Sequence, residues 1–203
     1  MVQTMRKGNA RERRQVRMRE AIIQAAEEII EAQGPDALNM RDVAERIDYS
    51  ASNLYEYFSS KDELLAAVIE EALTRLMMHV RSISTDLSAR ERLLSYGHMY
   101  LEFARMHPQL YLLIFGRKMV QAKPANLEEN PYSLLLQIVE EGLAEGPFVS
   151  RPGFGLREMT FGCWSLVHGI AMLRLTMHSA MAETSSESDD QILKSFVNGM
   201  SFH

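Results

Sequence analysis

The sequence has a single cysteine, Cys163, and therefore cannot form a disulfide within the chain. Proteins of a reducing cytosol typically have this composition. No apolar segment follows the basic start of the sequence, so we expect no secretory signal. The most apolar run, residues 163–177, contains Ser165, His168 and Arg174 and is too short and too polar for a membrane span. We therefore expect a cytoplasmic protein without a membrane partner.

The sequence also lacks the motifs that common enzyme mechanisms need. It contains neither a glycine-rich phosphate loop nor a motif of paired carboxylates. Cys163 and His168 are five residues apart in a predicted helix, a spacing that does not suit a nucleophile–base pair. His98 and Glu102, at i and i+4, could bind a metal ion, but no third ligand lies at a suitable spacing. We therefore expect no catalytic residues, no metal site and no cofactor.

Charge is unevenly distributed along the chain, whose net charge is −5. Residues 1–20 contain seven basic and two acidic residues, a net charge of +5, so the remainder carries −10. A basic end on an acidic body indicates an arm that binds a polyanion. We predict a flexible basic arm at residues 1–14. The alternative is a solvated leader that binds nothing.

Three helical patterns with end signals come next. The first begins near Gln15 and ends at Gly34, a glycine cap followed by proline. The second follows an N-cap at Asn39, and the third follows an N-cap at Ser50. Between them Asp48 can adopt the left-handed conformation that a tight turn needs. The inward-facing residues are Ile22, Ala26, Ile29 and Ile30 in the first helix, Met40, Val43, Ala44 and Ile47 in the second, and Leu54 and Phe58 in the third.

A fourth helix is predicted to connect these patterns to the rest of the chain. The segment 60–63 has the sequence of a capping box and marks its start. Two short helices joined by a tight turn are the form in which many proteins read the major groove of DNA. We therefore predict a helix-turn-helix DNA-binding domain at residues 15–64.

Residues 20–73 resemble the N-terminal domain of the tetracycline-repressor (TetR) family of transcriptional regulators. The matching residues are Ala37, Leu38, the segment 40–47, Ser50, Leu54, Tyr55, Tyr57, Phe58, Lys61, Leu64 and Leu65. The family usually has a small residue, glycine and valine at the turn, where this chain has Ile47, Asp48 and Tyr49. It also has a glycine in the third helix, where this chain has Ser52. We expect the turn to be the place where this chain differs from its relatives.

The resemblance implies four phosphate contacts, from Asn39, Tyr55, Tyr57 and Lys61. Amide, phenol and ammonium donors beside helix N-termini suit an anion. The residues expected nearest the base edges are Ser50, Ala51, Ser52 and Asn53. Asn53 suits adenine, Ala51 suits a thymine methyl group, and Arg41 can reach a guanine edge or a phosphate. The alternative for Tyr55 is packing in the domain core.

Helical patterns dominate the remaining residues, 65–203. The predicted helices span residues 90–106, 109–115, 131–144, 156–181 and 191–200. The predicted loops are residues 123–130 and 146–155, and the serine-rich acidic segment 183–190 is predicted to be exposed.

Two segments of this region, 103–115 and 163–169, resemble the C-terminal domain of a TetR subgroup whose hallmark is Trp-x-x-x-His-Gly, here Trp164, His168 and Gly169. The resemblance implies a ligand-binding and dimerisation domain. An apolar cavity with a few polar groups would suit a lipophilic small-molecule effector. The candidate pocket residues are Met99, Phe103, Tyr111, Phe115, Leu135, Ile138, Trp164, His168 and Met172. The alternative is that these residues are plain core.

We therefore predict an all-α homodimer in which a three-helix helix-turn-helix domain is joined by a long helix to a helical bundle for ligand binding and dimerisation. Dimerisation is expected through residues 156–181 and 191–200. The predicted function is transcriptional regulation, as a repressor that a ligand releases from a palindromic operator in double-stranded DNA. The alternative is a helical homodimeric interaction protein that has this fold but no specific DNA binding.

Overall fold

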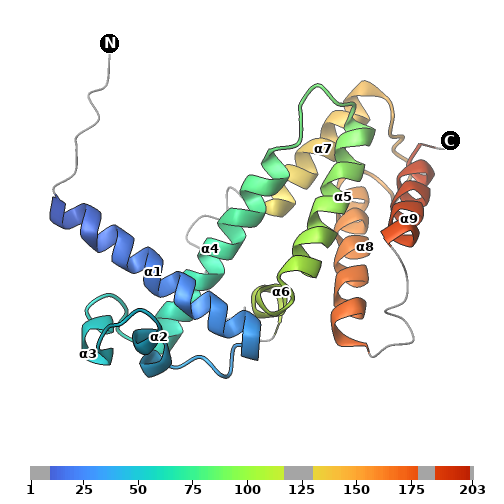
Figure 1. Cartoon of the computed structure of the whole chain (residues 1–203). Coiled ribbons are helices and arrows are strands. Elements are labelled where there is room, and N and C mark those ends of the chain that lie inside the picture. Colours follow the sequence, from blue (N-terminus) through green and yellow to red (C-terminus); the bar gives the residue numbers. More distant parts are fainter. Residues whose placement is uncertain (1–9, 117–129, 178–185, 202–203) are drawn as a thin grey trace, which may run out of the picture. The chain divides into compact units, whose positions relative to one another are not determined.

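A computed structural model describes residues 10–116, 130–177 and 186–201 of the chain (Figure 1). Among these residues helices dominate and no strand is present, apart from an isolated bridge between Arg151 and Phe154. The helices are α1 (Ala10–Gln33), α2 (Met40–Arg46), α3 (Ala51–Leu54), α4 (Lys61–Arg81), α5 (Ala89–Met106), α6 (Pro108–Phe115), α7 (Pro131–Glu145), α8 (Leu156–Thr176) and α9 (Ser186–Gly199). The all-α prediction is confirmed. No helix within the described ranges is long and apolar enough to cross a membrane.

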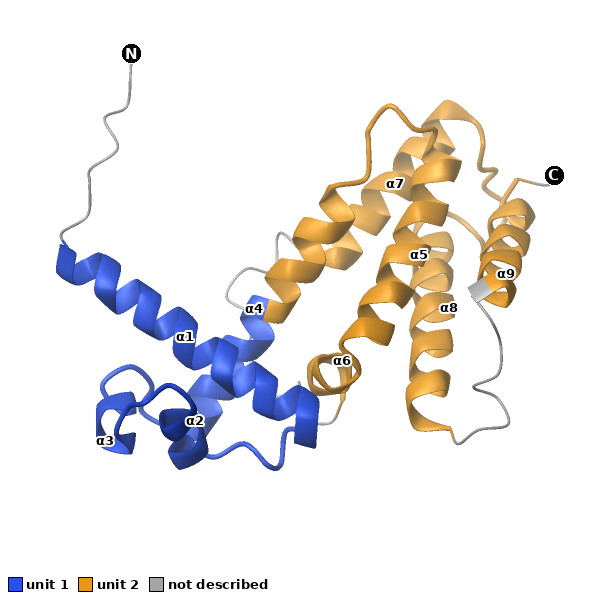
Figure 2. Cartoon of the chain, viewed as in Figure 1, with its two compact units in different colours: residues 1–71 blue, residues 72–203 orange. Residues whose placement is uncertain are grey.

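The chain forms two compact units, residues 1–71 and residues 72–203 (Figure 2). The boundary lies inside α4, seven residues beyond the boundary that the sequence suggested after residue 64. A helix that continues across a boundary between units gives no local sequence signal there, because its periodicity is unbroken.

In the first unit α1 packs against α2, and α2 packs against α3. The second half of α1 contributes the inward-facing isoleucines, and Leu54 and Phe58 are buried as predicted. Gly34 adopts a positive φ of 83° and ends α1, where its N–H donates to the Ile30 carbonyl at 2.7 Å. The start of α1 differs from the prediction. It begins at Ala10, so residues 10–14 of the predicted flexible arm are helical, and residues 1–9 lie outside the described ranges.

In the second unit α5, α7 and α8 pack against one another, and α9 and α6 pack against α5 (Figure 1). Tyr96, Tyr100 and Tyr111 are among the largest fully buried side chains. The capping geometry of α7 follows its sequence. The Asn130 side chain accepts a bond from the Ser133 N–H at 3.0 Å, and Gly146 ends the helix with a φ of 93°. Of the predicted loop 123–130, only Asn130 lies within the described ranges.

The ends of α8 and α9 differ from their predicted positions. α8 ends at Thr176 because Met177 is extended, with φ −100° and ψ 130°, so the predicted end at residue 181 is wrong. α9 begins at Ser186 and takes up part of the segment that was predicted to be exposed. Asp189 in this segment is only 6% exposed. Asp189 forms an ion pair with Arg174 of α8. The acidic composition of the segment 183–190 did not indicate this pair.

Candidate nucleic-acid interface and aromatic cluster

The Asn39 side chain is the N-cap of α2. Its Oδ1 accepts a hydrogen bond from the Asp42 N–H at 2.9 Å, and its Nδ2 donates to Asp42 Oδ2 at 2.7 Å. The Asp42 carboxylate therefore binds the capping side chain itself, and not the backbone N–H that it would bind in a capping box. A phosphate contact by Asn39 would have to share Nδ2 with this carboxylate.

The turn after α2 has the geometry of a Schellman motif. The Tyr49 N–H donates to the Ala44 carbonyl at 2.9 Å, and the Asp48 N–H donates to the Glu45 carbonyl at 3.2 Å. Asp48 has a φ of 55°, the left-handed conformation expected for it from the sequence. An aspartate therefore occupies the position at which helices usually end with glycine.

The short helix α3 presents small polar side chains to solvent. Ser50 is its N-cap and accepts a bond from the Asn53 N–H at 3.3 Å. Leu54 is fully buried, whereas Ser52 and Asn53 are exposed and Ala51 is half-buried. The helix ends at Leu54, but one further turn follows it, in which the Tyr57 and Phe58 N–H groups donate to the Leu54 carbonyl at 2.9 and 3.0 Å. Its apolar anchors thus leave one face free for a partner.

The two tyrosines and the lysine that follow lie in different environments. Tyr55 is 53% exposed, so its alternative as a residue of the domain core is wrong. Tyr57 is half-buried. Lys61 is also half-buried, and its Nζ donates to the Asp36 carbonyl at 3.3 Å, which holds the ammonium group near the start of α4. Arg41 is exposed in the first turn of α2.

In the second unit an aromatic cluster forms around His168. The ring of Trp164 stacks on the imidazole at 5.2 Å between centroids and an angle of 26°, and the Phe115 ring meets it edge-on at 5.2 Å. The His168 Nδ1 lies 2.7 Å from the Tyr111 hydroxyl and 3.4 Å from the Tyr100 hydroxyl. Four of the candidate pocket residues are therefore in one cluster, together with Tyr100.

Burial keeps the polar groups of the aromatic cluster uncharged near neutral pH. It raises the pKa of Tyr100 to about 12 and raises the pKa of Tyr111 further. Burial also lowers the pKa of His168 below the ordinary histidine value. The phenols therefore remain hydrogen-bond donors, and the imidazole remains neutral and able to donate through one nitrogen and accept through the other.

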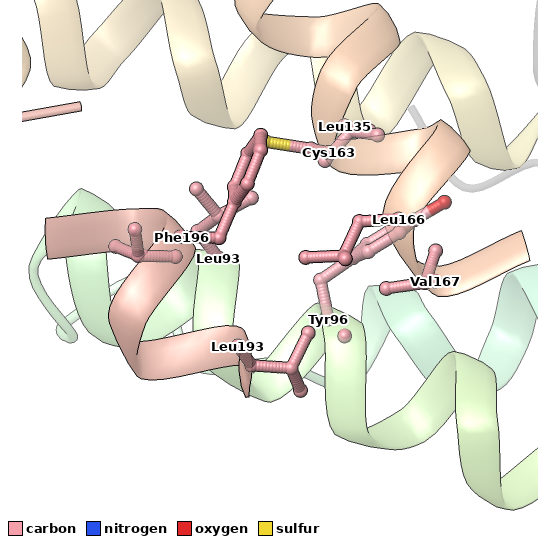
Figure 3. Close-up of a pocket in the computed structure, with 10 residues that line it drawn as sticks. Leu93, Tyr96, Leu135, Cys163, Leu166, Val167, Leu193 and Phe196 are labelled. Atoms are coloured by element: carbon pink, nitrogen blue, oxygen red, sulfur yellow. The ribbon is translucent and has the colours of Figure 1, made fainter. Parts of the chain in front are cut away.

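The other candidate pocket residues lie elsewhere in the second unit. Leu135 lines a small apolar cavity between α5, α7, α8 and α9 (Figure 3). Phe103 is buried and its ring lies 5.3 Å from that of His107, along an open groove between α4 and α5. Ile138 is buried, and Met99 and Met172 are half-buried. The structure therefore does not bring all nine residues together.

The small cavity is too small for an effector. Its volume is about 10 Å³, which is enough for at most one water molecule. The residues that line it are Leu93, Tyr96, Gly97, Leu135, Cys163, Leu166, Val167, Leu193, Phe196 and Val197 (Figure 3). Burial raises the pKa of the Cys163 thiol to about 12. This part of the unit is packed core.

His98 and Glu102, the two possible metal ligands noted in the sequence, each have a different charged partner. His98 Nε2 lies 3.3 Å from Asp190 Oδ1, and Glu102 lies 3.8 Å from His79 Nε2. No group of three potential ligands occurs within the residues that the structure describes.

Two interactions were not indicated by the sequence patterns. The Arg19 guanidinium lies 5.1 Å above the Phe58 ring, and Arg174 pairs with the buried Asp189. Arg19 precedes the buried Ile22 and Ile23 by three and four residues, and this spacing could have shown that it faces inward. The partner of Arg174 lies in a different helix, α9, so the spacing of residues within α8 carries no information about it.

Comparison with known proteins agrees with both units. Residues 22–68 match the family described as bacterial regulatory proteins, tetR family, and residues 93–196 match the tetracyclin repressor-like C-terminal domain. The chain therefore belongs to the TetR family of transcriptional regulators, which bind DNA through a helix-turn-helix domain and are not enzymes. The Trp-x-x-x-His-Gly subgroup stays a prediction.

Individual relatives are similar over different parts of the chain. The transcriptional activator FasR of Mycolicibacterium smegmatis is 35% identical over 92 residues, which are 45% of this chain and 42% of FasR. The HTH-type transcriptional regulator YobS of Bacillus subtilis is 22% identical over 88% of this chain and 90% of its own length. A tetR-family regulatory protein from Rhodococcus has a similar fold, with a TM-score of 0.70 and 18% identity over 91% of this chain and 97% of its own.

Proposed function

We propose that this chain is a homodimeric repressor that binds a palindromic operator in the cytoplasm and is released by a small-molecule effector. The observation that supports DNA reading most directly is the form of α3. Its apolar residue Leu54 is buried, while Ser52, Asn53 and Tyr55 face solvent beside an intact helix-turn-helix turn. Exposed hydroxyl, amide and phenol groups are the donors and acceptors that contact bases and phosphates.

The proposed base contacts are Ser50, Ala51, Ser52, Asn53 and Arg41, and the proposed phosphate contacts are Asn39, Tyr55, Tyr57 and Lys61. Lys61 is well suited to this role because the Asp36 carbonyl limits the positions of its ammonium group. Asn39 is a weaker candidate as a direct contact, since its side chain already binds Asp42. Its cap would instead fix the N-terminus of α2, whose free N–H groups attract a phosphate.

Exposed apolar side chains support dimerisation through α8 and α9. Phe161, Leu173 and Met177 at α8 are 59%, 49% and 45% exposed, and Ile192 on α9 is 40% exposed. Such residues on adjacent helices are typical of an interface between subunits. Two helix-turn-helix domains related by a two-fold axis would enter successive major grooves about 34–36 Å apart.

The aromatic cluster supports an effector with an apolar body and a polar group. Rings from Phe115, Tyr111 and Trp164 supply apolar contact area, and His168 offers a hydrogen bond. If effector and operator prefer different conformations, each weakens the binding of the other by the same factor. A lipophilic compound that quenches Trp164 fluorescence would test this. Unchanged operator affinity at saturation with the compound would contradict release by that ligand.

DNA binding itself is tested with Lys61→Ala and Tyr57→Phe. Both variants are expected to weaken binding to every duplex by a similar factor, because phosphate contacts carry no sequence information. Lys61→Ala is also expected to reduce the slope of log K against log salt by about 0.9 for each subunit bound. Arg105→Ala is the matched control, since Arg105 is exposed on α5 in the other unit, outside the proposed dimer helices α8 and α9.

The alternative is a helical interaction protein that has the fold without specific DNA binding. No binding of the wild-type chain to any duplex at low salt would favour it over the proposed repressor. Selection of bound sequences from a random DNA pool would then also recover no common motif.

A further inference from the structure

The first half of α1 is a basic helix with little packing of its own. The buried residues of α1 begin at Ile22, whereas residues 10–20 are exposed except for the half-buried Met18. This stretch contains five arginines and two glutamates, a net charge of +3. An isolated helix of this length is marginal in water. It is nevertheless continuous with the packed half of α1, which can propagate it.

Arg19 differs from the other arginines of this stretch. The residues three, four and seven positions after it, Ile22, Ile23 and Ala26, are all buried, so Arg19 lies on the inward face of α1. Its guanidinium lies over the Phe58 ring and near Glu63, whose pKa is lowered first by hydrogen bonds from Ser59 and further by this positive charge. Arg19 therefore fixes the first half of α1 against the segment that follows α3 in the helix-turn-helix domain.

Arg14 and Arg17 lie away from the inward face. They are three residues apart and are neighbours on one side of the helix. Both are exposed, as are Glu20 and Gln24, three and seven residues after Arg17. Neither arginine has an ion-pair partner among the described residues.

The rest of the first unit is strongly acidic. Residues 21–71 contain three basic and twelve acidic residues, a net charge of −9. One of the three cations is already paired within the unit, because Arg46 lies 2.9 Å from Glu28, so only Arg41 and Lys61 remain to attract DNA. A duplex carries one negative charge for about every 1.7 Å of its axis. The helix-turn-helix alone would therefore be repelled at long range.

We propose that Arg14 and Arg17 form a second DNA-binding surface, here named the arginine ridge, which binds phosphates outside the major groove and supplies much of the electrostatic affinity. This proposal rests on the proposed DNA-binding function and adds where the favourable charge comes from. Guanidinium groups bind phosphate oxygens in a bidentate manner, and a helix holds them at fixed spacing. Because phosphates are the same in every sequence, the arginine ridge strengthens binding to operator and non-operator DNA alike.

The test compares Arg14→Gln/Arg17→Gln with wild-type protein in titrations of a duplex of arbitrary sequence and of a duplex selected from a random pool. Glutamine has nearly the helix propensity of arginine, so α1 is preserved, as circular dichroism would verify. We expect weaker binding to both duplexes, with an unchanged ratio between the two binding constants. The slope of log K against log salt is expected to fall by about 1.8 for each subunit bound, and so by about 3.6 for the proposed dimer, because each subunit loses two phosphate contacts.

The matched control is Arg81→Gln/Arg105→Gln, which changes net charge equally but at exposed residues of the second unit outside the proposed dimer helices α8 and α9. It is expected to leave the slope within experimental error of wild type. Equal slopes for the ridge variant and wild type would overturn the proposed arginine ridge. If Lys61→Ala weakened DNA binding in the same experiments, the proposed DNA-binding function would still stand. Binding of the wild-type chain to vesicles of anionic phospholipid but to neither duplex would overturn both.

Discussion

Asp48 combines a helix-ending geometry with a side chain that is poorly suited to it. A left-handed conformation costs most residues about 1–2 kcal/mol, and aspartate somewhat less because its side chain can form local hydrogen bonds. Glycine adopts the conformation without this cost. We predict that Asp48→Gly raises the free energy of unfolding by about 0.5–1 kcal/mol, measured as a shift of the urea midpoint.

Asp48→Asn provides the control for this prediction. Asparagine also tolerates the left-handed region, so a gain seen with glycine but not with asparagine is due to the backbone and not to loss of charge. A lower midpoint for Asp48→Gly would show that the aspartate stabilises the turn through its side chain.

Trp164 is the chain's single tryptophan, and its ring stacks on His168. Protonated imidazole quenches the fluorescence of an adjacent indole. Because burial lowers the pKa of His168, we predict that quenching on acidification has its midpoint below the ordinary histidine pKa. His168→Gln is expected to abolish this transition, and a midpoint at or above the ordinary value would contradict the assigned burial.

The same shift has a consequence for stability. Since the pKa of His168 is lower in the folded state than in the unfolded state, folding favours the neutral ring. The resulting stabilisation is present above the unfolded-state pKa and is lost as pH falls through the folded-state pKa. His168→Gln should remove this part of the pH dependence of unfolding.

Caps were predictable at the residue scale, whereas contacts between distant residues were not. Asn39, Ser50 and Gly34 act through bonds to residues three or four positions away, so their roles are visible in a short stretch of sequence. The contact between Arg19 and Phe58 joins α1 to the segment that follows α3. Its existence depends on how α1 packs, which no local pattern specifies.

At the scale of elements, Gly142 allows α7 to pack closely on its neighbours. A Cβ on Gly142 would overlap the Phe148 ring and lie 3.2 Å from the Ala89 Cβ. We predict that Gly142→Ala lowers the free energy of unfolding by about 1–3 kcal/mol, as expected for overpacking. The measurement is thermal or urea unfolding of both forms.

A second variant separates overpacking from other effects at this position. In Gly142→Ala/Phe148→Leu the smaller side chain makes room for the methyl group, so the double variant should lose less stability than the two single changes add up to. Strict additivity would show that Phe148 is not what limits the space beside α7.

Helix ends were the least predictable features of the elements. Apolar periodicity continues past Thr176, which led to a predicted end of α8 at residue 181, but Met177 is extended. Likewise, the acidic composition of the segment 183–190 favoured exposure, whereas Arg174 compensates the charge of Asp189 and allows its burial. Composition describes the average environment of a segment, and a single partner can override it.

At the scale of the whole molecule, the exposed apolar residues of α8 and α9 predict the proposed dimer. Burying one phenylalanine contributes about 1.5–3 kcal/mol, so Phe161→Glu should weaken the dimer by at least about tenfold. Sedimentation at micromolar concentration would show a larger fraction of monomers. Met106→Glu is the control, because Met106 is 59% exposed but lies on α5.

Phe161→Glu also tests whether DNA binding needs the helix-turn-helix domains of both subunits. A dimer gains affinity because its second half-site contact is intramolecular, so Phe161→Glu should weaken operator binding more strongly than it weakens binding to a single half-site. Undiminished dimerisation would place the interface elsewhere on the chain.

The all-α architecture and the family could be inferred from sequence, but the exact division into units could not. The pattern of caps and stripes from Asn39 to Phe58 specified the helix-turn-helix almost completely, since its parts are local. The candidate pocket was less predictable. Tyr111, Phe115, Trp164 and His168 meet in one cluster, whereas Leu135 and Phe103 lie in other surroundings. Helical spacing shows which residues face inward and leaves open which of them meet.

The burial of Cys163 makes the protein suitable for site-specific labelling. Thiol reagents attack the thiolate, and this sulfur is both covered and held 3.7 Å from the Met200 Sδ. A cysteine introduced at the exposed Ser52 would therefore react selectively, without removal of the native one. Spin labels at that position in the proposed dimer would report the distance between the two reading helices directly, with and without an effector.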